Sequence, residues 1–133
     1  MESQLTLTTM KLLYRKAEAA KKAAYAPYSK FHVGAAVLTA DGSVFTGVNI
    51  ENSSYPVGLC AERSAMAKAV SEGHTDPLAC AISGGEGQAC WPCGMCRQFL
   101  FEFNKDMTII TGSDEDHLET ALLSELLEKG FTL

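Results

Sequence analysis

Two short segments of the chain carry residues that can bind a metal ion. Cys60 opens the segment "CAERSAMAKAV", and Cys93 and Cys96 lie three residues apart in "PCGMCRQ". Each segment has the pattern of a helix start, where backbone N–H groups and the helix dipole favour the thiolate form of cysteine. Zn²⁺ prefers tetrahedral sulfur and nitrogen ligation, and a catalytic site keeps three protein ligands and one open position. We therefore predict that Cys60, Cys93 and Cys96 bind one Zn²⁺ ion.

The residues that follow Cys60 favour a catalytic metal site over a structural one. A hydrolytic zinc needs a neighbouring group that moves protons, and Glu62 lies two residues after Cys60. Arg63 lies three residues after Cys60, on the same helix face, and can donate to the sulfur ligands. Taken alone, Glu62 would more simply complement the helix dipole and Arg63 would be a surface residue. Their position beside a cysteine favours the functional roles.

The other two cysteines leave one alternative open. Cys90 precedes Cys93 by three residues and would complete a closed, four-thiolate structural zinc site. We expect Pro92 to break the helix before Cys93, which leaves Cys90 in the incoming loop. Cys80 lies in the apolar segment "PLACAIS" and is most simply a buried core residue.

The pattern of apolar residues predicts an α/β fold that would position these groups. The expected elements are a helix over 8–24, a hairpin over 31–50 with its turn at Asp41-Gly42, a helix over 60–71 ending near Gly73, a strand over 77–83, a helix over 93–103, a strand over 107–111, and a tail over 117–131 with a short edge strand and a short helix. This order predicts three α/β/α layers around a mixed, roughly five-stranded sheet. A chain of 133 residues fits a single domain, 1–133.

Composition disfavours several other classes of protein. The net charge of −5 disfavours a nucleic-acid binder, and the basic residues of the first helix are more simply a solvated face. The sequence has no apolar run that could span a bilayer and no secretory signal in its first ten residues. Five cysteines, an odd number, argue against a disulfide framework and favour metal or thiol chemistry. We therefore expect a cytoplasmic protein with no membrane or nucleic-acid partner.

The motifs "CAE" and "PCGMC" resemble the zinc signature of the cytidine deaminase superfamily. Because Cys60 replaces the histidine of that signature, the chain resembles the three-cysteine variant that is typical of small homotetrameric nucleoside deaminases. The resemblance extends over nearly the whole chain, through "YAPYSKFHVGAA", "GVNIENSSYP", "CAERSA", "PCGMCRQ" and "LLEKGF". It implies the cytidine deaminase-like fold and a hydrolase of pyrimidine salvage. Such an enzyme deaminates cytidine and deoxycytidine to uridine and deoxyuridine plus ammonia, as a homotetramer with sites at subunit interfaces.

The resemblance also implies roles for individual residues. Zinc-bound hydroxide would attack C4 of cytosine while Glu62 moves the protons, with Arg63 beside the sulfurs. The implied substrate-binding residues are Phe31 stacking on the base, Asn49 and Glu51 on the ribose 3′-hydroxyl, Ala61 through its backbone N–H on the base carbonyl, Tyr55 near the sugar, and Phe131 closing a neighbouring subunit's site. Without the resemblance, the simpler roles are hairpin core for Phe31, strand-end polar groups for Asn49 and Glu51, and a tail anchor for Phe131.

The sequence also departs from the family pattern and leaves rival functions. The tail lacks the usual proline before Phe131, and the pair Cys90-Trp91 is unusual before the second zinc motif. A deaminase of another small aminated nucleoside, such as blasticidin S, is disfavoured because that family lacks the Asn49 and Glu51 pair. The acidic net charge disfavours an enzyme that edits polynucleotides. A non-catalytic module built on structural zinc would instead have four thiolates and no turnover.

Overall fold

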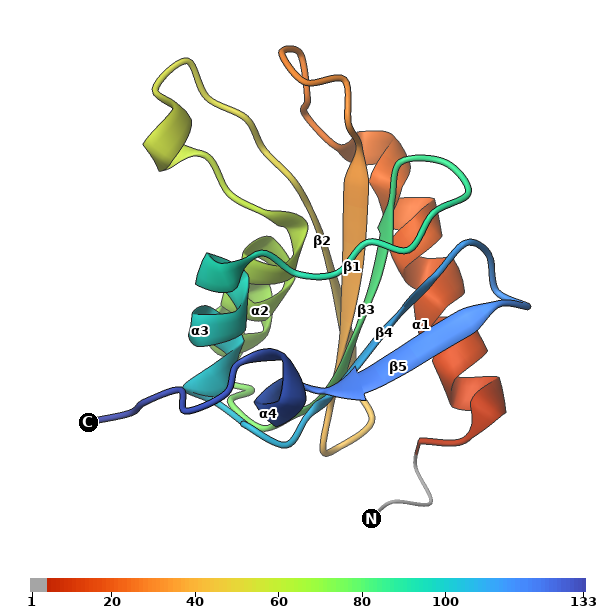
Figure 1. The fold of residues 1–133 in the computed structure, drawn as a ribbon, viewed down its shortest axis with the longest axis vertical. Coiled ribbons are helices and arrows are strands. Elements are labelled where there is room, and N and C mark those ends of the chain that lie inside the picture. Colours follow the sequence, from red (N-terminus) through yellow and green to blue (C-terminus); the bar gives the residue numbers. More distant parts are fainter. Residues whose placement is uncertain (1–4) are drawn as a thin grey trace.

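A five-stranded mixed sheet lies at the centre of the molecule, with helices on both faces (Figure 1). The computed structural model describes residues 5–133, so residues 1–4 of the predicted domain 1–133 lie outside the described residues. In chain order the elements are α1 (Leu7–Ala20), the 3-10 helix η2 (Lys21–Ala23), β1 (Val33–Thr39), β2 (Val44–Val48), the 3-10 helix η3 (Tyr55–Val57), α2 (Ala61–Ser71), β3 (Pro77–Gly84), α3 (Gly94–Phe101), β4 (Thr108–Gly112), β5 (Leu118–Leu122) and α4 (Leu123–Leu126).

The strands lie in the order β2-β1-β3-β4-β5. β1 pairs antiparallel with both β2 and β3, and β4 pairs antiparallel with β5. β3 and β4 are parallel, which requires a crossover, and α3 lies in that connection. The predicted mixed sheet between helical layers is confirmed.

The central strand β1 explains why its segment reads as a continuous apolar run. All seven of its residues are buried, and neighbouring side chains of a strand point to opposite faces. Ala36 and Leu38 belong to the core under α1. Ala35 and Val37 belong to the core on the opposite face, which includes residues of α2 and α3. The sheet therefore separates two cores, and the α2 and α3 side carries the cysteine motifs.

The predicted helices and strands are all present, with ends that differ by a few residues. The expected first helix ran to residue 24, whereas α1 ends at Ala20 and continues as η2. The turn at Asp41-Gly42 is confirmed, and Gly42 has the positive φ of 91° that favours glycine. The tail has the expected edge strand and short helix, β5 and α4. Sequence patterns did not predict η3 or the bridges that Ile50 makes with Tyr25 and Leu59.

The basic face of α1 is paired in part with acidic residues near β5. Lys11 lies 3.3 Å from Asp116, and Arg15 lies 2.7 Å from Glu115. Exposed ion pairs of this kind contribute little to the stability of a fold, because solvent screens them. They nevertheless support the interpretation of this face as a solvated surface.

Among residues 5–133, no helix combines the length and the apolar character that a membrane span requires.

Close helix–sheet packing positions the helix that carries Cys60. A Cβ atom at Gly47 of β2 would lie 2.3 Å from the backbone nitrogen of Ala65 in α2. A Cβ atom at Gly34 of β1 would likewise lie 2.0 Å from the carbonyl oxygen of Ala17 in α1. Only glycine permits such close approach of a helix to a strand. The position of α2 is therefore set by backbone contact, and Cys60 is the residue that directly precedes the helix.

Candidate functional site

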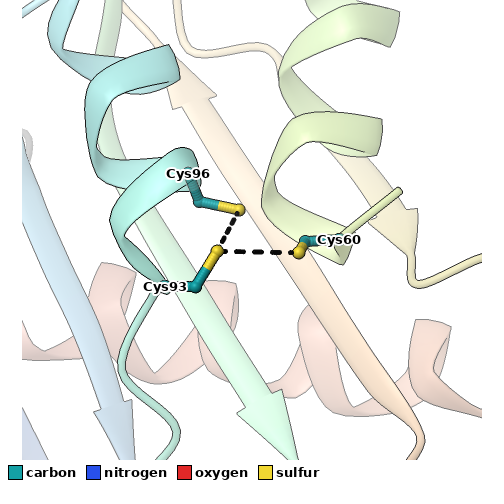
Figure 2. A group of neighbouring side chains, drawn as sticks. All are labelled: Cys60, Cys93 and Cys96. Atoms are coloured by element: carbon teal, nitrogen blue, oxygen red, sulfur yellow. Dashed lines mark hydrogen bonds between the residues drawn. The ribbon is translucent and has the colours of Figure 1, made fainter. Parts of the chain in front are cut away.

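The three predicted metal ligands lie together at two helix starts. Cys60 is the N-cap residue of α2, and Cys93 is the N-cap residue of α3. Cys96 follows in the first turn of α3 and is fully buried. Figure 2 shows the three side chains pointing toward one another from these two helices. Their sulfurs lie within 4.8 Å of one another, with 3.8 Å between Cys60 and Cys93 and 3.5 Å between Cys93 and Cys96.

The sulfur spacing fits tetrahedral zinc. With the usual Zn–S length, two sulfurs on one tetrahedral zinc lie about 3.8 Å apart. In the described part of the chain, the candidate metal-binding group has three members and does not include Cys90. The Cys90 sulfur lies instead against Gly84, where an added Cβ would be only 2.5 Å away. The geometry therefore favours three protein ligands and an open fourth position over a closed four-thiolate site.

The Cys60 sulfur favours the thiolate form, which suits a cation. Hydrogen bonds from the Cys96 thiol and the Arg63 guanidinium lower the pKa of Cys60 to about 5, although burial opposes this shift. The same sulfur–sulfur contact and burial raise the pKa of Cys96. Arg63 Nη2 lies 3.7 Å from the Cys60 sulfur and 3.5 Å from the carbonyl oxygen of Gly58. A bound divalent cation would release the remaining protons, because thiolates are the metal ligands.

Glu62 is the one buried acidic residue in the described chain, with 4% of its surface exposed. It is the second residue of α2 and lines the same cavity as Cys60 and Cys93. Burial raises the pKa of Glu62 to about 7. A cation held by the three sulfurs would favour its carboxylate form. A carboxyl group in this position can accept and return protons beside the metal site.

The cavity in front of the sulfurs has a volume of about 680 Å³, which suits a small organic molecule. Five of the six residues predicted to bind substrate line it: Phe31, Asn49, Glu51, Tyr55 and Ala61.

Phe131, the sixth of these residues, does not line the cavity of its own chain. Its side chain is 65% exposed, and its carbonyl oxygen accepts a hydrogen bond from Gln98 on α3. Its predicted role in a neighbouring subunit stays a prediction. Cys90 and Trp91 also line the cavity, and Cys80 is fully buried in β3 as expected.

Asn49 and Glu51 also hold the cavity wall in place. Asn49 Oδ1 accepts from the backbone N–H of Val33 at 2.9 Å, and Asn49 Nδ2 donates to the carbonyl oxygen of Phe31 at 2.8 Å. The Glu51 carboxylate accepts hydrogen bonds from the backbone N–H groups of Tyr28 and Ser29 and from the Ser29 hydroxyl. The Ser29 hydroxyl is also the main reason that the pKa of Glu51 is lowered.

These bonds tie the cavity's polar residues to the loop that carries Phe31. The sequence pattern held no signal for them, since the partners of Glu51 lie more than twenty residues away.

The loop before Cys93 is held by hydrogen bonds that the sequence pattern also did not reveal. Arg97 Nε donates to the carbonyl oxygen of Pro92 at 2.7 Å, and Arg97 Nη1 donates to that of Leu126 at 2.8 Å. The backbone N–H of Cys90 donates to the hydroxyl of Thr111 at 2.8 Å. Both anchors come from outside the segment that they hold.

Comparison with protein families identifies this combination of motifs. Residues 7–112 match the family model described as the cytidine and deoxycytidylate deaminase zinc-binding region. The chain is similar to the cytidine deaminase of Halalkalibacterium halodurans, with 43% identity over 122 residues that cover 91% of this chain and 92% of that protein. It is 42% identical to the cytidine deaminase of Mycobacterium tuberculosis over 123 residues, which cover 92% and 89% of the two chains.

Solved structures of similar proteins have the same fold. The cytidine deaminase of Burkholderia pseudomallei superposes with a TM-score of 0.84 at 38% identity, covering 90% of this chain and 97% of that chain. The cytidine deaminase of Mycobacterium tuberculosis superposes with a TM-score of 0.82 at 40% identity, covering 92% and 96%.

We predict that Cys96→Ala abolishes stoichiometric zinc binding, whereas Cys90→Ala retains one zinc per chain. Removing one of three thiolates leaves too few ligands, but the Cys90 sulfur packs against Gly84 outside the sulfur cluster. Elemental analysis of the purified variants, after dialysis against a weak chelator, measures the difference. A zinc content of Cys90→Ala as low as that of Cys96→Ala would instead indicate a four-thiolate site.

Proposed function

This chain belongs to the cytidine and deoxycytidylate deaminase family, and we propose that it hydrolyses cytidine and deoxycytidine to uridine, deoxyuridine and ammonia. The observation that carries the proposal is the meeting of three sulfurs within 4.8 Å of one another beside a buried carboxyl group in one cavity. Hydrolytic deamination needs an activated water, a group that moves protons, and a pocket for the base. The site offers a candidate for each.

Zinc would be held by the sulfurs of Cys60, Cys93 and Cys96. The chemistry that it supplies when bound is activation of water as a nucleophile near neutral pH. The Arg63 guanidinium lies beside the Cys60 sulfur and would offset the excess negative charge of three thiolates. Helix starts at Cys60 and Cys93 favour the same thiolates through their N–H groups.

Glu62 would move the protons of the reaction. Its carboxylate accepts a proton from the attacking water and returns one to N3 of cytosine, which makes C4 more electrophilic. Glu62 then accepts the proton of the hydroxyl group now bonded to C4 and passes it to the amino group, which leaves as ammonia while C4 becomes a carbonyl. Burial of Glu62 excludes bulk water from the transfer and raises the pKa of its carboxyl group to about 7.

The remaining cavity residues would bind the nucleoside. Phe31 offers a ring for stacking on the base, and the backbone N–H of Ala61 is placed at the start of α2, where donors are free. Asn49 and Glu51 would hydrogen-bond the ribose 3′-hydroxyl with the donor and acceptor capacity that their internal bonds leave. Tyr55, which is 75% exposed, would lie near the sugar at the mouth of the cavity.

We predict that Glu62→Gln lowers kcat by at least about 10³-fold, because the amide can neither accept nor return the transferred proton. Zinc content should remain that of the unmodified protein, since Glu62 is outside the sulfur cluster. An ultraviolet assay of cytidine conversion measures the rate. Glu72→Gln, an exposed acid-to-amide change at the other end of α2, is the control. A Glu62→Gln variant with undiminished turnover would refute the assignment.

We also predict that the enzyme discriminates against a substrate without the 3′-hydroxyl. A hydrogen bond to a charged group contributes about 1.5–3 kcal/mol, so kcat/KM should be about 10–100-fold lower for 2′,3′-dideoxycytidine than for 2′-deoxycytidine. In Glu51→Gln this ratio should fall toward one, whereas Glu72→Gln should keep it. An unchanged ratio in Glu51→Gln would remove Glu51 from sugar recognition.

We further predict a homotetramer in which Phe131 reaches the cavity of a neighbouring subunit. Phe131 is exposed and lies outside its own cavity, and the cavity mouth at Tyr55 is open in a single chain. Analytical ultracentrifugation should give four chains per particle, and Phe131→Ala should raise KM. A monomer with full activity would contradict this assembly.

A cytoplasmic location fits the five free cysteines, because reducing compartments preserve thiols. Cell fractionation would check this location.

A further inference from the structure

The hydroxyl of Thr111 is a buried polar group that the proposed reaction does not use. Thr111 lies in β4 and has no exposed surface. Its hydroxyl donates to the carbonyl oxygen of Ile82 at 2.9 Å and accepts from the backbone N–H of Cys90 at 2.8 Å. One donor and one acceptor interaction satisfy a hydroxyl group in a dry environment. The group therefore links β3, β4 and the loop that follows β3.

The position of Thr111 in the sheet explains why a side chain is needed there. The parallel ladder between β3 and β4 ends at the pair Ala81 and Ile110. Ile82 and Thr111 come directly after this last pair, where the two strands no longer pair through their backbones. In open α/β sheets, ligands commonly bind beyond the carboxyl ends of the strands. The Thr111 side chain supplies a hydrogen bond between β3 and β4 just beyond the end of the ladder, and it also hydrogen-bonds the loop that follows β3.

The bond at Cys90 acts three residues before a proposed zinc ligand. Trp91 and Pro92 connect Cys90 to Cys93, and the proline ring restricts the backbone between them. Arg97 holds the carbonyl oxygen of Pro92 at 2.7 Å. The loop is thus held at its downstream end by Arg97 and at its upstream end by Thr111.

The side chain of Cys90 has little freedom to compensate for a lost backbone bond. Its sulfur lies where a Cβ atom on Gly84 would be 2.5 Å away. Cys90 and Trp91 both line the cavity, so a shift of this loop would move the cavity wall and the sulfur of Cys93 together.

We propose that Thr111 is a positioning residue of the metal centre: its hydroxyl fixes the backbone of Cys90 and, through the short segment 90–92, the place of the Cys93 sulfur. The inference rests on the proposed role of Cys93 as a zinc ligand. Residues that orient metal ligands from outside typically change metal affinity or activity about 10–100-fold when they are replaced.

The test measures how fast zinc leaves the zinc-loaded protein for a chromogenic chelator. Thr111→Val removes the hydroxyl and keeps the shape, and we expect it to release zinc about 10-fold faster than the unmodified protein. Thr111→Ser restores the hydroxyl and should release zinc at the original rate. In activity assays Thr111→Val should lower kcat more than it changes KM, because the metal site moves more than the nucleoside-binding residues.

Thr39→Val is the matched control. Thr39 is also fully buried, and its hydroxyl bonds Asp41 and the carbonyl oxygen of Ser43 beside the β1–β2 turn, outside the cavity lining. The Thr39→Val variant should lower the melting temperature as Thr111→Val does, but it should leave the rate of zinc release unchanged. Equal zinc release from Thr111→Val and Thr39→Val would overturn the proposal.

A second measurement covers the case in which Thr111→Val does not fold. Hydrogen exchange of the unmodified, zinc-loaded protein should show the Cys90 amide protected, and rapid exchange at that amide would overturn the proposal. Cys93→Ala separates this failure from a failure of the proposed function. Full zinc binding by Cys93→Ala would refute the ligand assignment, whereas its loss of zinc combined with unchanged release from Thr111→Val refutes the positioning role alone.

Discussion

The meeting of two helix starts is the constraint on which the rest of the structure depends. Three sulfurs share a space of 4.8 Å only because Cys60 caps α2 and Cys93 caps α3 at adjoining positions. Each helix start supplies unpaired N–H groups that favour negative charge. Packing must therefore hold two electropositive ends together, and negative charge on the sulfurs between them offsets their repulsion. The backbone contact of α2 with Gly47 and the anchors of the loop before α3 do this.

The same arrangement divides the site into a rigid part and a more adaptable part. The sulfurs proposed to bind the metal and Glu62 are at the starts of helices α2 and α3, which pack on one face of the sheet. The residues proposed to bind the nucleoside lie mostly in the connections after η2 and β2. Chemistry that requires sub-ångström placement thus rests on regular elements, while recognition rests on loops whose shape depends on side-chain hydrogen bonds.

How much could be predicted from the sequence depends on how far apart along the chain the interacting residues lie. Helices, strands and the sulfur set were predictable because apolar periodicity and the spacing of Cys93 and Cys96 are local patterns. Cys60 was assigned to that set because catalytic zinc has three protein ligands and because the chain resembles the family. The bonds made by Thr111 and Glu51 were not predictable, because each joins residues more than twenty positions apart. No local pattern distinguishes these side chains from other polar residues at strand ends.

The internal bonds of Asn49 have a consequence for how this enzyme could evolve. Its amide holds the backbone on both sides of His32, at Phe31 and Val33, while the same amide is proposed to recognise the sugar. A substitution there would be pleiotropic, because a new sugar preference and a displaced aromatic ring would arise in one step. Substitutions that change the preferred nucleoside should therefore arise first at neighbouring positions such as Tyr55, whose side chain is exposed and does not hold the cavity wall in the way that Asn49 does.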